Sequence, residues 1–253
     1  ECSAMSMKYL GKHFDIHAGG VDLIFPHHEN EIAQSEASTN KKFVNYWVHN
    51  EHLLVDGHKM SKSLGNFYTL RDLLNKGYNP KAIRYLLLSV HYRVQLNFTE
   101  ESVKASDNAV QRLNDFMIKL KEIKNNVKNN KIEKIIQKTK KLFEDAMDDD
   151  INISVALSHI FEFVKKVNTL MMQNKVGKND AKKMINFMHD TDKVLGILEE
   201  KEEKLSSEFK KLIDEREKAR KEKDFAKADK IRNELKQKGI VLEDTKEGVR
   251  WKR

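Results

Sequence analysis

Cysteine is nearly absent from this sequence: Cys2 is the only one among 253 residues, so no intrachain disulfide can form. A chain without a disulfide framework suits a reducing compartment, and we expect the cytoplasm. No apolar run approaches the ~20 residues of a membrane-spanning helix, and no signal peptide is visible. The sequence therefore excludes a disulfide-rich secreted domain and predicts no association with membranes.

Proline is almost as scarce, with two residues, while hydrophobic residues make up 39% and charged residues 34%. This balance favours long solvated helices over a sheet-rich sandwich. The net charge of +8 and the pI near 9.2 suit a polyanionic partner such as RNA. A lysine- and asparagine-rich proteome would explain the same excess nearly as well, so charge alone does not decide. A chain of this length has room for two or three domains.

Residues 1 to about 66 hold seven of the ten histidines and five of the ten glycines, which is typical of a catalytic segment built of strands, turns and short helices. We expect strands at Phe14–His17 and Leu53–Val55, the latter ending in an Asp56-Gly57 turn. Residues His27–Ser38 are expected to form a helix, with Pro26 at or near its first turn.

Helical spacing dominates from Leu70 onward. Longer amphipathic helices are expected at about 100–124, 132–147, 153–172 and 179–199. Residues 208–238 are expected to form two more helices, and a small hairpin is expected at the carboxy terminus. The sequence predicts a mostly α fold with an α/β part.

Two lysines three residues apart, Lys59 and Lys62, lie in the Ser- and Gly-containing stretch Lys59–Asn66. Two ammonium groups on such a loop can close over a polyphosphate and neutralise charge on a leaving pyrophosphate. Ser61 and Ser63 can donate to phosphate or cap the loop. An ordinary solvated lysine loop would look the same, so the stretch indicates nucleotide chemistry only if its neighbours agree.

A metal site is one interpretation of Cys2, His27 and Glu31. His27 and Glu31 stand four residues apart on a predicted helix, so their side chains project from one face. Cys2 adds a thiolate, which gives three of the four ligands of a tetrahedral zinc site. Without context, an exposed His–Glu pair on a helix and an inert buried cysteine is the better interpretation.

Gly19 and Gly20 follow the first predicted strand and would let the backbone approach a bound adenosine, while Asp22 accepts hydrogen bonds from it. A tight structural turn is the alternative. His17 could contact the substrate, or it could be a satisfied core histidine. Asp148–Asp150 lacks the glycine and final glutamate of an EF-hand, so we expect a helix boundary there, with Asn152 as the N-cap of the next helix.

The sequence resembles the cysteinyl-tRNA synthetases, which are class I aminoacyl-tRNA synthetases, in ordered segments that span almost the whole chain. Lys59–Ser63 resembles the KMSKS signature of that class. The other similar segments are Glu1–Met5, Phe14–Gly20, Asp22–Leu23, Phe25–Ser35, Tyr92–Arg93, Leu96–Asn97, Ala146–Asp150 and Gly239–Asp244.

The resemblance implies ATP-dependent activation of L-cysteine, with Mg²⁺, and transfer of the cysteinyl group to tRNA(Cys). It implies that Lys59 and Lys62 are catalytic. The family's zinc site has two cysteines, a histidine and a glutamate, and three of these fall on Cys2, His27 and Glu31. A soft thiolate binds zinc far better than a serine hydroxyl, so zinc selects the substrate by donor chemistry. The adjacent His28 is expected to face away and to have a packing or hydrogen-bonding role.

By the same resemblance, the other cysteine and the family's His-x-Gly-His signature belong to an amino-terminal half that this sequence does not contain. The chain is therefore expected to be the carboxy-terminal portion of a longer ligase, and to be inactive or nearly so alone.

Four residues fall at positions that read anticodon bases in the family: Arg220, Phe225, Asp229 and Asp244. A ring or guanidinium would stack on a base, and the carboxylates would accept from base amino groups. Phe225 replaces the more usual tryptophan, so stacking is expected to be weaker. Taken alone, Arg220 and Asp229 would be read as ordinary ion pairs on an exposed helix face.

The expected organisation begins with the second half of a Rossmann-like catalytic domain, carrying the zinc site and the lysine loop, at residues 1–69. Connecting helices at 70–99, a helical-bundle anticodon-binding domain at 100–200 and a small mixed α/β domain at 205–253 follow. We expect a monomer. The alternatives are a ligase that joins cysteine to an amino-sugar, against which the RNA-reading tail argues, and a non-catalytic tRNA-binding module.

Overall fold

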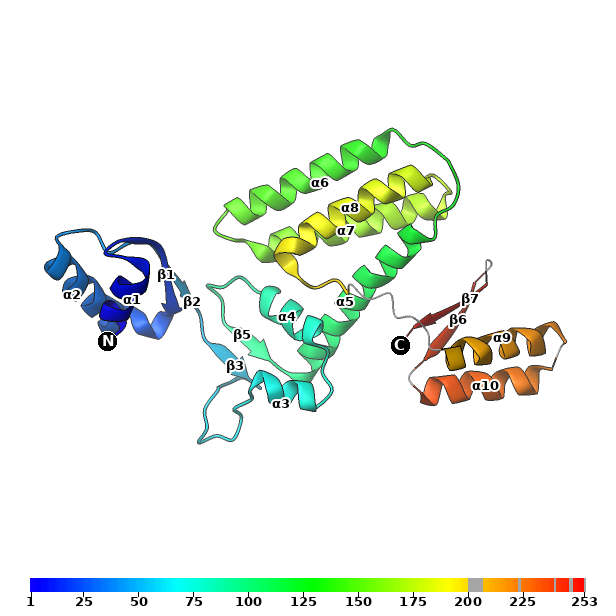
Figure 1. Ribbon diagram of the computed structural model, residues 1–253, viewed down its shortest axis with the longest axis horizontal. Helices are drawn as coiled ribbons and strands as arrows, with labels where there is room; N and C mark the ends of the chain where they lie inside the picture. The colour runs from blue at the N-terminus through cyan, green and yellow to red at the C-terminus, as the bar shows by residue number, and fades with distance from the viewer. Residues whose placement is uncertain (200–206, 223, 239, 246–247, 253) are drawn as a thin grey trace. The chain divides into compact units, whose positions relative to one another are not determined.

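The structure is a computed structural model that describes residues 1–199, 207–222, 224–238, 240–245 and 248–252 (Figure 1). The chain divides into two compact units, Glu1–Glu199 and Glu200–Arg253. Helices dominate both units, and the predicted mostly α fold with an α/β part is confirmed. None of the helices in the described ranges is both long and apolar enough to cross a membrane.

The first unit begins with a parallel strand pair joined through a helix. Its elements are α1 (Cys2–Leu10), β1 (Phe14–Gly20), the short helical turns η1 (Val21–Leu23) and η2 (Ile24–His28), α2 (Glu29–Thr39) and β2 (Val44–Asn50). β1 and β2 pair in parallel, with Phe14 opposite Val44 and Gly20 opposite Asn50. The strand predicted at the start of β1 is confirmed, whereas β2 was not predicted. The helix predicted at His27–Ser38 corresponds to α2, which begins at Glu29. His27 and His28 belong to the preceding turn η2, in which Phe25 has extended backbone angles.

A three-stranded sheet follows, made of β3 (Leu53–Val55), β4 (His58–Lys59) and β5 (Leu96–Phe98) in the order β4-β3-β5. The predicted turn is present, since Asp56 and Gly57 have φ of 50° and 77°, as a two-residue hairpin turn requires. α3 (Leu70–Asn75) and α4 (Pro80–Leu88) pack on this sheet, and the buried residues between them are Val55, Leu73, Ile83, Leu86, Phe98 and Val103.

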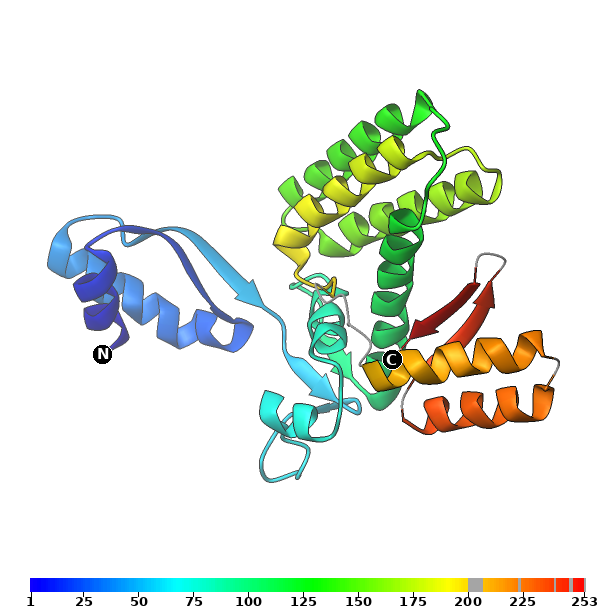
Figure 2. The same ribbon diagram turned by 45° about the vertical axis from the view of Figure 1, so that its right-hand side comes forward.

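Four longer helices form the bundle that completes the first unit: α5 (Glu100–Lys121), α6 (Lys131–Asp148), α7 (Ile153–Met172) and α8 (Lys178–Leu195). Figures 1 and 2 both show α6, α7 and α8 side by side. Asn152 caps α7 as predicted, because its side chain accepts from the amide of Val155. α8 ends earlier than predicted, since Gly196 takes a left-handed C-cap conformation with φ of 63°.

The connection between α5 and α6 packs tightly against the start of α8. The amide of Lys178 donates to the carbonyl of Asn125 at 2.8 Å, and the amide of Asn129 donates to Asp180 Oδ2 at 3.0 Å. A Cβ atom on Gly177 would lie 1.9 Å from the carbonyl oxygen of Val127. Only glycine fits at this crossing of two backbones.

We therefore expect Gly177→Ala to destabilise the bundle by about 1 to 3 kcal/mol, because the clash involves backbone that cannot rotate away. The melting temperature should fall by several degrees in a thermal scan, roughly 2 to 4 °C per kcal/mol. Lys178→Ala, an exposed change at the next residue, should leave it within about 1 °C. Equal melting temperatures for Gly177→Ala and the unaltered protein would contradict the packing described here.

The second unit contains α9 (Ser207–Lys221), α10 (Phe225–Gln237), β6 (Val241–Thr245) and β7 (Gly248–Lys252). β6 and β7 form the predicted antiparallel hairpin, with Leu242 opposite Trp251. A small core holds the unit together and consists of Ile231, Leu235, Ile240 and Leu242, with Phe209, Leu212 and Ile213 against it.

Candidate functional site

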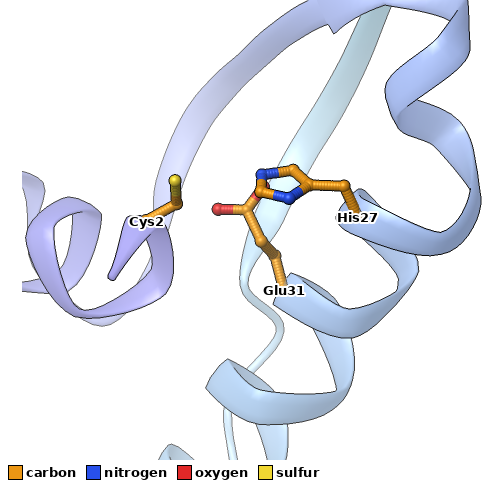
Figure 3. Close-up of side chains that lie close together, drawn as sticks. All are labelled: Cys2, His27 and Glu31. Atoms are coloured by element: carbon orange, nitrogen blue, oxygen red, sulfur yellow. The ribbon is translucent and has the colours of Figure 1, made fainter.

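The three predicted metal ligands lie together in the first unit. Cys2 opens α1, His27 lies in η2 and Glu31 lies in the first turn of α2. Their Sγ, imidazole nitrogen and carboxylate oxygen all lie within 4.8 Å of one another. In Figure 3 the carboxylate of Glu31 lies between the thiol of Cys2 and the ring of His27. The helical spacing of His27 and Glu31 places both on the side that faces α1.

The carboxylate of Glu31 is the buried member of this group. Its side chain is 3% exposed, and neither oxygen has a hydrogen-bond partner. A buried carboxylate that accepts no hydrogen bond is costly, and a cation would remove that cost. Thiolate sulfur, imidazole nitrogen and carboxylate oxygen are the ligand types that zinc takes in proteins. The residues present therefore fit a zinc ion.

Two further imidazoles border the same carboxylate. Nε2 of His17 lies 3.2 Å from Glu31 Oε2, and Nε2 of His28 lies 3.8 Å from it. His17, His28 and Glu31 form a second group whose ligand atoms lie within 4.8 Å of one another. The expectation that His28 faces away was wrong, because its ring points into the cluster. Burial, followed by the nearby rings of His17 and His49, lowers the pKa of His28, which keeps this imidazole neutral at pH 7.

Strand β2, which was not predicted, brings His49 and Trp47 to this cluster. His28 Nδ1 and His49 Nε2 lie 2.7 Å apart and share a hydrogen bond, so the expected hydrogen-bonding role of His28 is present. The ring of Trp47 lies 4.7 Å from that of His17, centroid to centroid. Nothing in the local sequence marks His49 as part of the site, because its place depends on the pairing of β2 with β1.

The predicted adenosine-binding residues follow β1. Gly19 and Gly20 end the strand, and Asp22 lies exposed in η1. A Cβ on Gly19 would lie 2.8 Å from Cε1 of His28, which is itself held by hydrogen bonding. The absence of a side chain at this position is therefore needed for the histidine cluster to pack against the strand.

The lysine loop runs from β4 to α3, and the side chain of Asn66 closes it. The amide of Ser61 donates to Asn66 Oδ1 at 2.8 Å, and Asn66 Nδ2 donates to the carbonyl oxygen of Lys59 at 3.2 Å. Ser61 Oγ and Ser63 Oγ lie 3.1 Å apart. The ammonium of Lys62 lies 5.7 Å from the centroid of the Phe67 ring. Both lysines are exposed, so their ammonium groups can approach a ligand from solvent.

Three of the four predicted anticodon residues have described side chains, all in the second unit. Arg220 is exposed near the end of α9, Phe225 is 60% exposed at the start of α10, and Asp229 is exposed one turn later. Asp229 borders a cavity of about 390 Å³ with Arg232, Asn233, Lys236 and Leu242. Asp244 belongs to β6, but its side chain lies outside the described part of the chain.

Comparison with known protein families gives three matches in chain order. Residues 1–108 match the class I tRNA synthetase (C) catalytic domain, residues 142–199 match the DALR domain, and residues 202–251 match the cysteinyl-tRNA ligase anticodon binding domain. The predicted metal ligands and the lysine loop fall in the first match, and the predicted anticodon residues fall in the third.

Curated relatives include the cysteine–tRNA ligases of Brachyspira hyodysenteriae, 54% identical, and Protochlamydia amoebophila, 47% identical. Both alignments cover 100% of this chain but only 55% and 53% of the relative, so the chain spans about half their length.

Similar solved structures are a LeuRS–tRNA–LeuAMS complex from Agrobacterium radiobacter K84 and the methionyl-tRNA synthetase of Mycobacterium tuberculosis with methionyl-adenylate. The first has a TM-score of 0.54 at 16% identity and covers 69% of this chain and 25% of that one. The second has a TM-score of 0.51 at 18% identity and covers 72% and 40%. At these identities the likeness concerns the fold. The three ordered domain matches and the curated relatives establish that the chain belongs to the cysteinyl-tRNA synthetase family of class I aminoacyl-tRNA synthetases.

Proposed function

We propose that the full-length protein carrying this chain is a cysteine–tRNA ligase, which activates L-cysteine with ATP and transfers it to tRNA(Cys). The observation that supports this most directly is the buried carboxylate of Glu31, which accepts no hydrogen bond and lies beside Cys2 and His27. A zinc ion held there would supply a soft Lewis acid that binds the thiolate of cysteine and binds the hydroxyl of serine poorly.

The residues of the lysine loop would serve the activation step. The carboxylate of cysteine attacks the α-phosphate of ATP, pyrophosphate leaves, and the adenylate then acylates the terminal adenosine of tRNA. Positioning and charge stabilisation dominate such a reaction. Lys59 and Lys62 would neutralise the charge on the leaving pyrophosphate, alongside the Mg²⁺ that accompanies ATP, and Ser61 and Ser63 would donate to phosphate oxygens.

The end of β1 and the turn that follows it would hold the adenosine of ATP. Gly19 and Gly20 leave room for adenosine against the backbone, and Asp22 would accept hydrogen bonds from it. His17 contacts Glu31 and would orient that carboxylate toward the metal. We expect His17 to lie near the thiol of the bound cysteine substrate.

The second unit would read the anticodon. Phe225 offers a ring for stacking and Asp229 a carboxylate at the cavity edge, with Arg220 and Asp244 as further contacts. The proposed organisation keeps a catalytic part at 1–69, connecting helices at 70–99, a bundle at 100–200 and a small tail domain at 205–253. We further propose a cytoplasmic, monomeric enzyme.

Two assays on the full-length protein test this proposal. ATP–pyrophosphate exchange should require cysteine and should reject serine by about 10⁴-fold or more, since a site built around one polar contact excludes an analogue that cannot make it. Aminoacylation should require tRNA(Cys). Exchange with cysteine but transfer to an amino-sugar instead of tRNA would contradict the proposal, as would tRNA binding with no exchange.

A further inference from the structure

Asp150 lies at the turn between α6 and α7, where the backbone leaves helical geometry. Asp150 and Ile151 have φ of 53° and 57°, in the left-handed region that side chains rarely adopt. Asn152 then caps α7. This conformation directs Asp150 out of the bundle and toward the segment between α4 and β5.

The carboxylate of Asp150 makes two short contacts with that segment. Arg93 Nε donates to Asp150 Oδ2 at 2.6 Å, and the hydroxyl of Tyr92 donates to Asp150 Oδ1 at 2.5 Å. Arg93 Nε also lies 3.1 Å from the Tyr92 hydroxyl oxygen. His91 Nε2 lies 3.0 Å from the carbonyl oxygen of Asp150. We call Tyr92, Arg93 and Asp150 the Asp150 clasp.

The other side of the clasp connects to the catalytic part of the chain. The amide of Glu51, immediately after β2, donates to the carbonyl of Tyr92 at 2.8 Å. Three residues beyond Arg93, β5 begins and pairs in parallel with β3, the strand before the lysine loop. The clasp therefore joins the α6–α7 turn to the point where the chain passes from β2, in the part that holds the candidate zinc ligands, into the lysine-loop sheet.

A second set of contacts lies at the same end of the bundle, because α7 begins where the antiparallel α8 ends. Lys81 Nζ donates to the carbonyl of Gly196 at 2.8 Å, and Arg84 donates to the carbonyls of Val194 and Leu195. Both cations belong to α4, which packs against the lysine-loop sheet. They cap the carboxy terminus of α8 and interact favourably with its dipole. The bundle is thus attached to the catalytic part through α4, α5 and the clasp.

Charge and exposure indicate what the clasp contributes. Hydrogen bonds from Arg93 and then from Tyr92 lower the pKa of Asp150, so this carboxylate is ionised at neutral pH. The side chains of Asp150 and Arg93 are 45% and 65% exposed, and exposed ion pairs add little to global stability. Charge-assisted bonds of this length nevertheless fix orientation well. The clasp is therefore suited to fix the orientation of the helical bundle relative to the catalytic part, and it contributes little to the stability of either part.

We propose that Asp150 is a positioning residue for aminoacylation: through Tyr92 and Arg93 it fixes the orientation of the helical bundle on the catalytic part, so that bound tRNA presents its acceptor end correctly. α5 alone is a lever of about 33 Å, so a small rotation at its start moves the far end by several ångströms. Misplacement by about 1 Å can cost a reaction about 100-fold. This inference rests on the proposed function.

Asp150→Asn in the full-length protein provides the kinetic test, because it removes the charge and keeps the shape. We expect kcat/KM for tRNA charging to fall about 10-fold, while ATP–pyrophosphate exchange, which needs no tRNA, stays within about twofold. The melting temperature should stay within about 2 °C, and Asp150→Glu should recover part of the loss. Asp148→Asn, an exposed carboxylate at the end of α6, is the matched control. Equal losses in charging and exchange, or no loss in charging, would overturn the proposal.

A distance measurement tests the same inference without any catalytic readout. Fluorophores introduced through unnatural amino acids at Lys41 and Met172, both exposed, would report the separation of the zinc-binding part from the bundle. Asp150→Asn should broaden the distance distribution, and Asp148→Asn should not. An unchanged distribution would refute the clasp even if the protein proved to be a cysteine–tRNA ligase, whereas a broadened one would support it even if the assigned reaction proved wrong.

Discussion

Replacing Glu31 with glutamine should lower the zinc affinity of the full-length protein by about 100-fold or more. The neutral amide is a poor zinc ligand, and even changes outside the ligand set cost about 10- to 100-fold. Metal analysis after dialysis against a chelator should show stoichiometric zinc in the unaltered protein and little in Glu31→Gln. The preference for cysteine over serine in pyrophosphate exchange should fall with it.

The same substitution should change stability in opposite directions with and without metal. In metal-free protein Glu31 is a buried carboxylate without a hydrogen-bond partner, so removing its charge should leave the melting temperature equal or higher. In zinc-loaded protein the stabilisation from metal binding, RT ln(1 + [Zn²⁺]/Kd), should be largely lost. A melting temperature that is unchanged or higher in the metal-free variant but lower in the zinc-loaded variant would identify Glu31 as a metal ligand. A residue needed only for packing would lower the melting temperature in both states.

Glu29→Gln is the matched control, because Glu29 lies in the same first turn of α2 and is exposed. It should leave zinc content, substrate preference and both melting temperatures unchanged. Stoichiometric zinc in Glu31→Gln would show that Glu31 is not a zinc ligand, and would contradict both groups of candidate ligands, because Glu31 belongs to each.

The sequence was sufficient for features that depend on local spacing. The i, i+4 relation of His27 and Glu31, the Asp56-Gly57 turn and the Asn152 cap each involve neighbouring residues, and each is present in the structure. The four helices of the bundle were also anticipated, because their apolar residues recur with helical spacing. Only their ends differ, where a left-handed residue such as Gly196 stops the helix.

What could not be predicted depends on contacts between distant residues. His49 and Trp47 reach the histidine cluster only because β2 pairs with β1 in one register, and the burial that results places the ring of His28 against Glu31. Likewise, no role for Tyr92 and Arg93 can be inferred from their local sequence, because their contact with Asp150 depends on the position of the α6–α7 turn. Side-chain orientation at such positions is set by tertiary packing, and no local pattern encodes it.

Replacing Lys62 with alanine should lower the rate of pyrophosphate exchange by about 10² to 10³-fold at saturating ATP. The loss of one preorganised contact to developing charge costs about 2.7 to 4 kcal/mol in the barrier. The exposed ammonium of Lys62 lies 5.7 Å from the ring centroid of Phe67 in this structure, a contact worth little at an exposed site. Lys62 can therefore leave the ring at small cost and move to the pyrophosphate as its charge builds.

The split between kcat and KM decides between this role and simple ATP binding. A contact made mainly in the transition state lowers kcat and kcat/KM together, whereas one made equally to bound ATP raises KM alone. Lys42→Ala removes the same charge from an exposed position on the α2–β2 connection and should change neither. Phe67→Leu removes the resting contact and should leave kcat within about twofold. If Lys62→Ala raised only KM, Lys62 would hold ground-state ATP, and transition-state stabilisation would have to come from Lys59, which the side chain of Asn66 keeps at the base of the same loop.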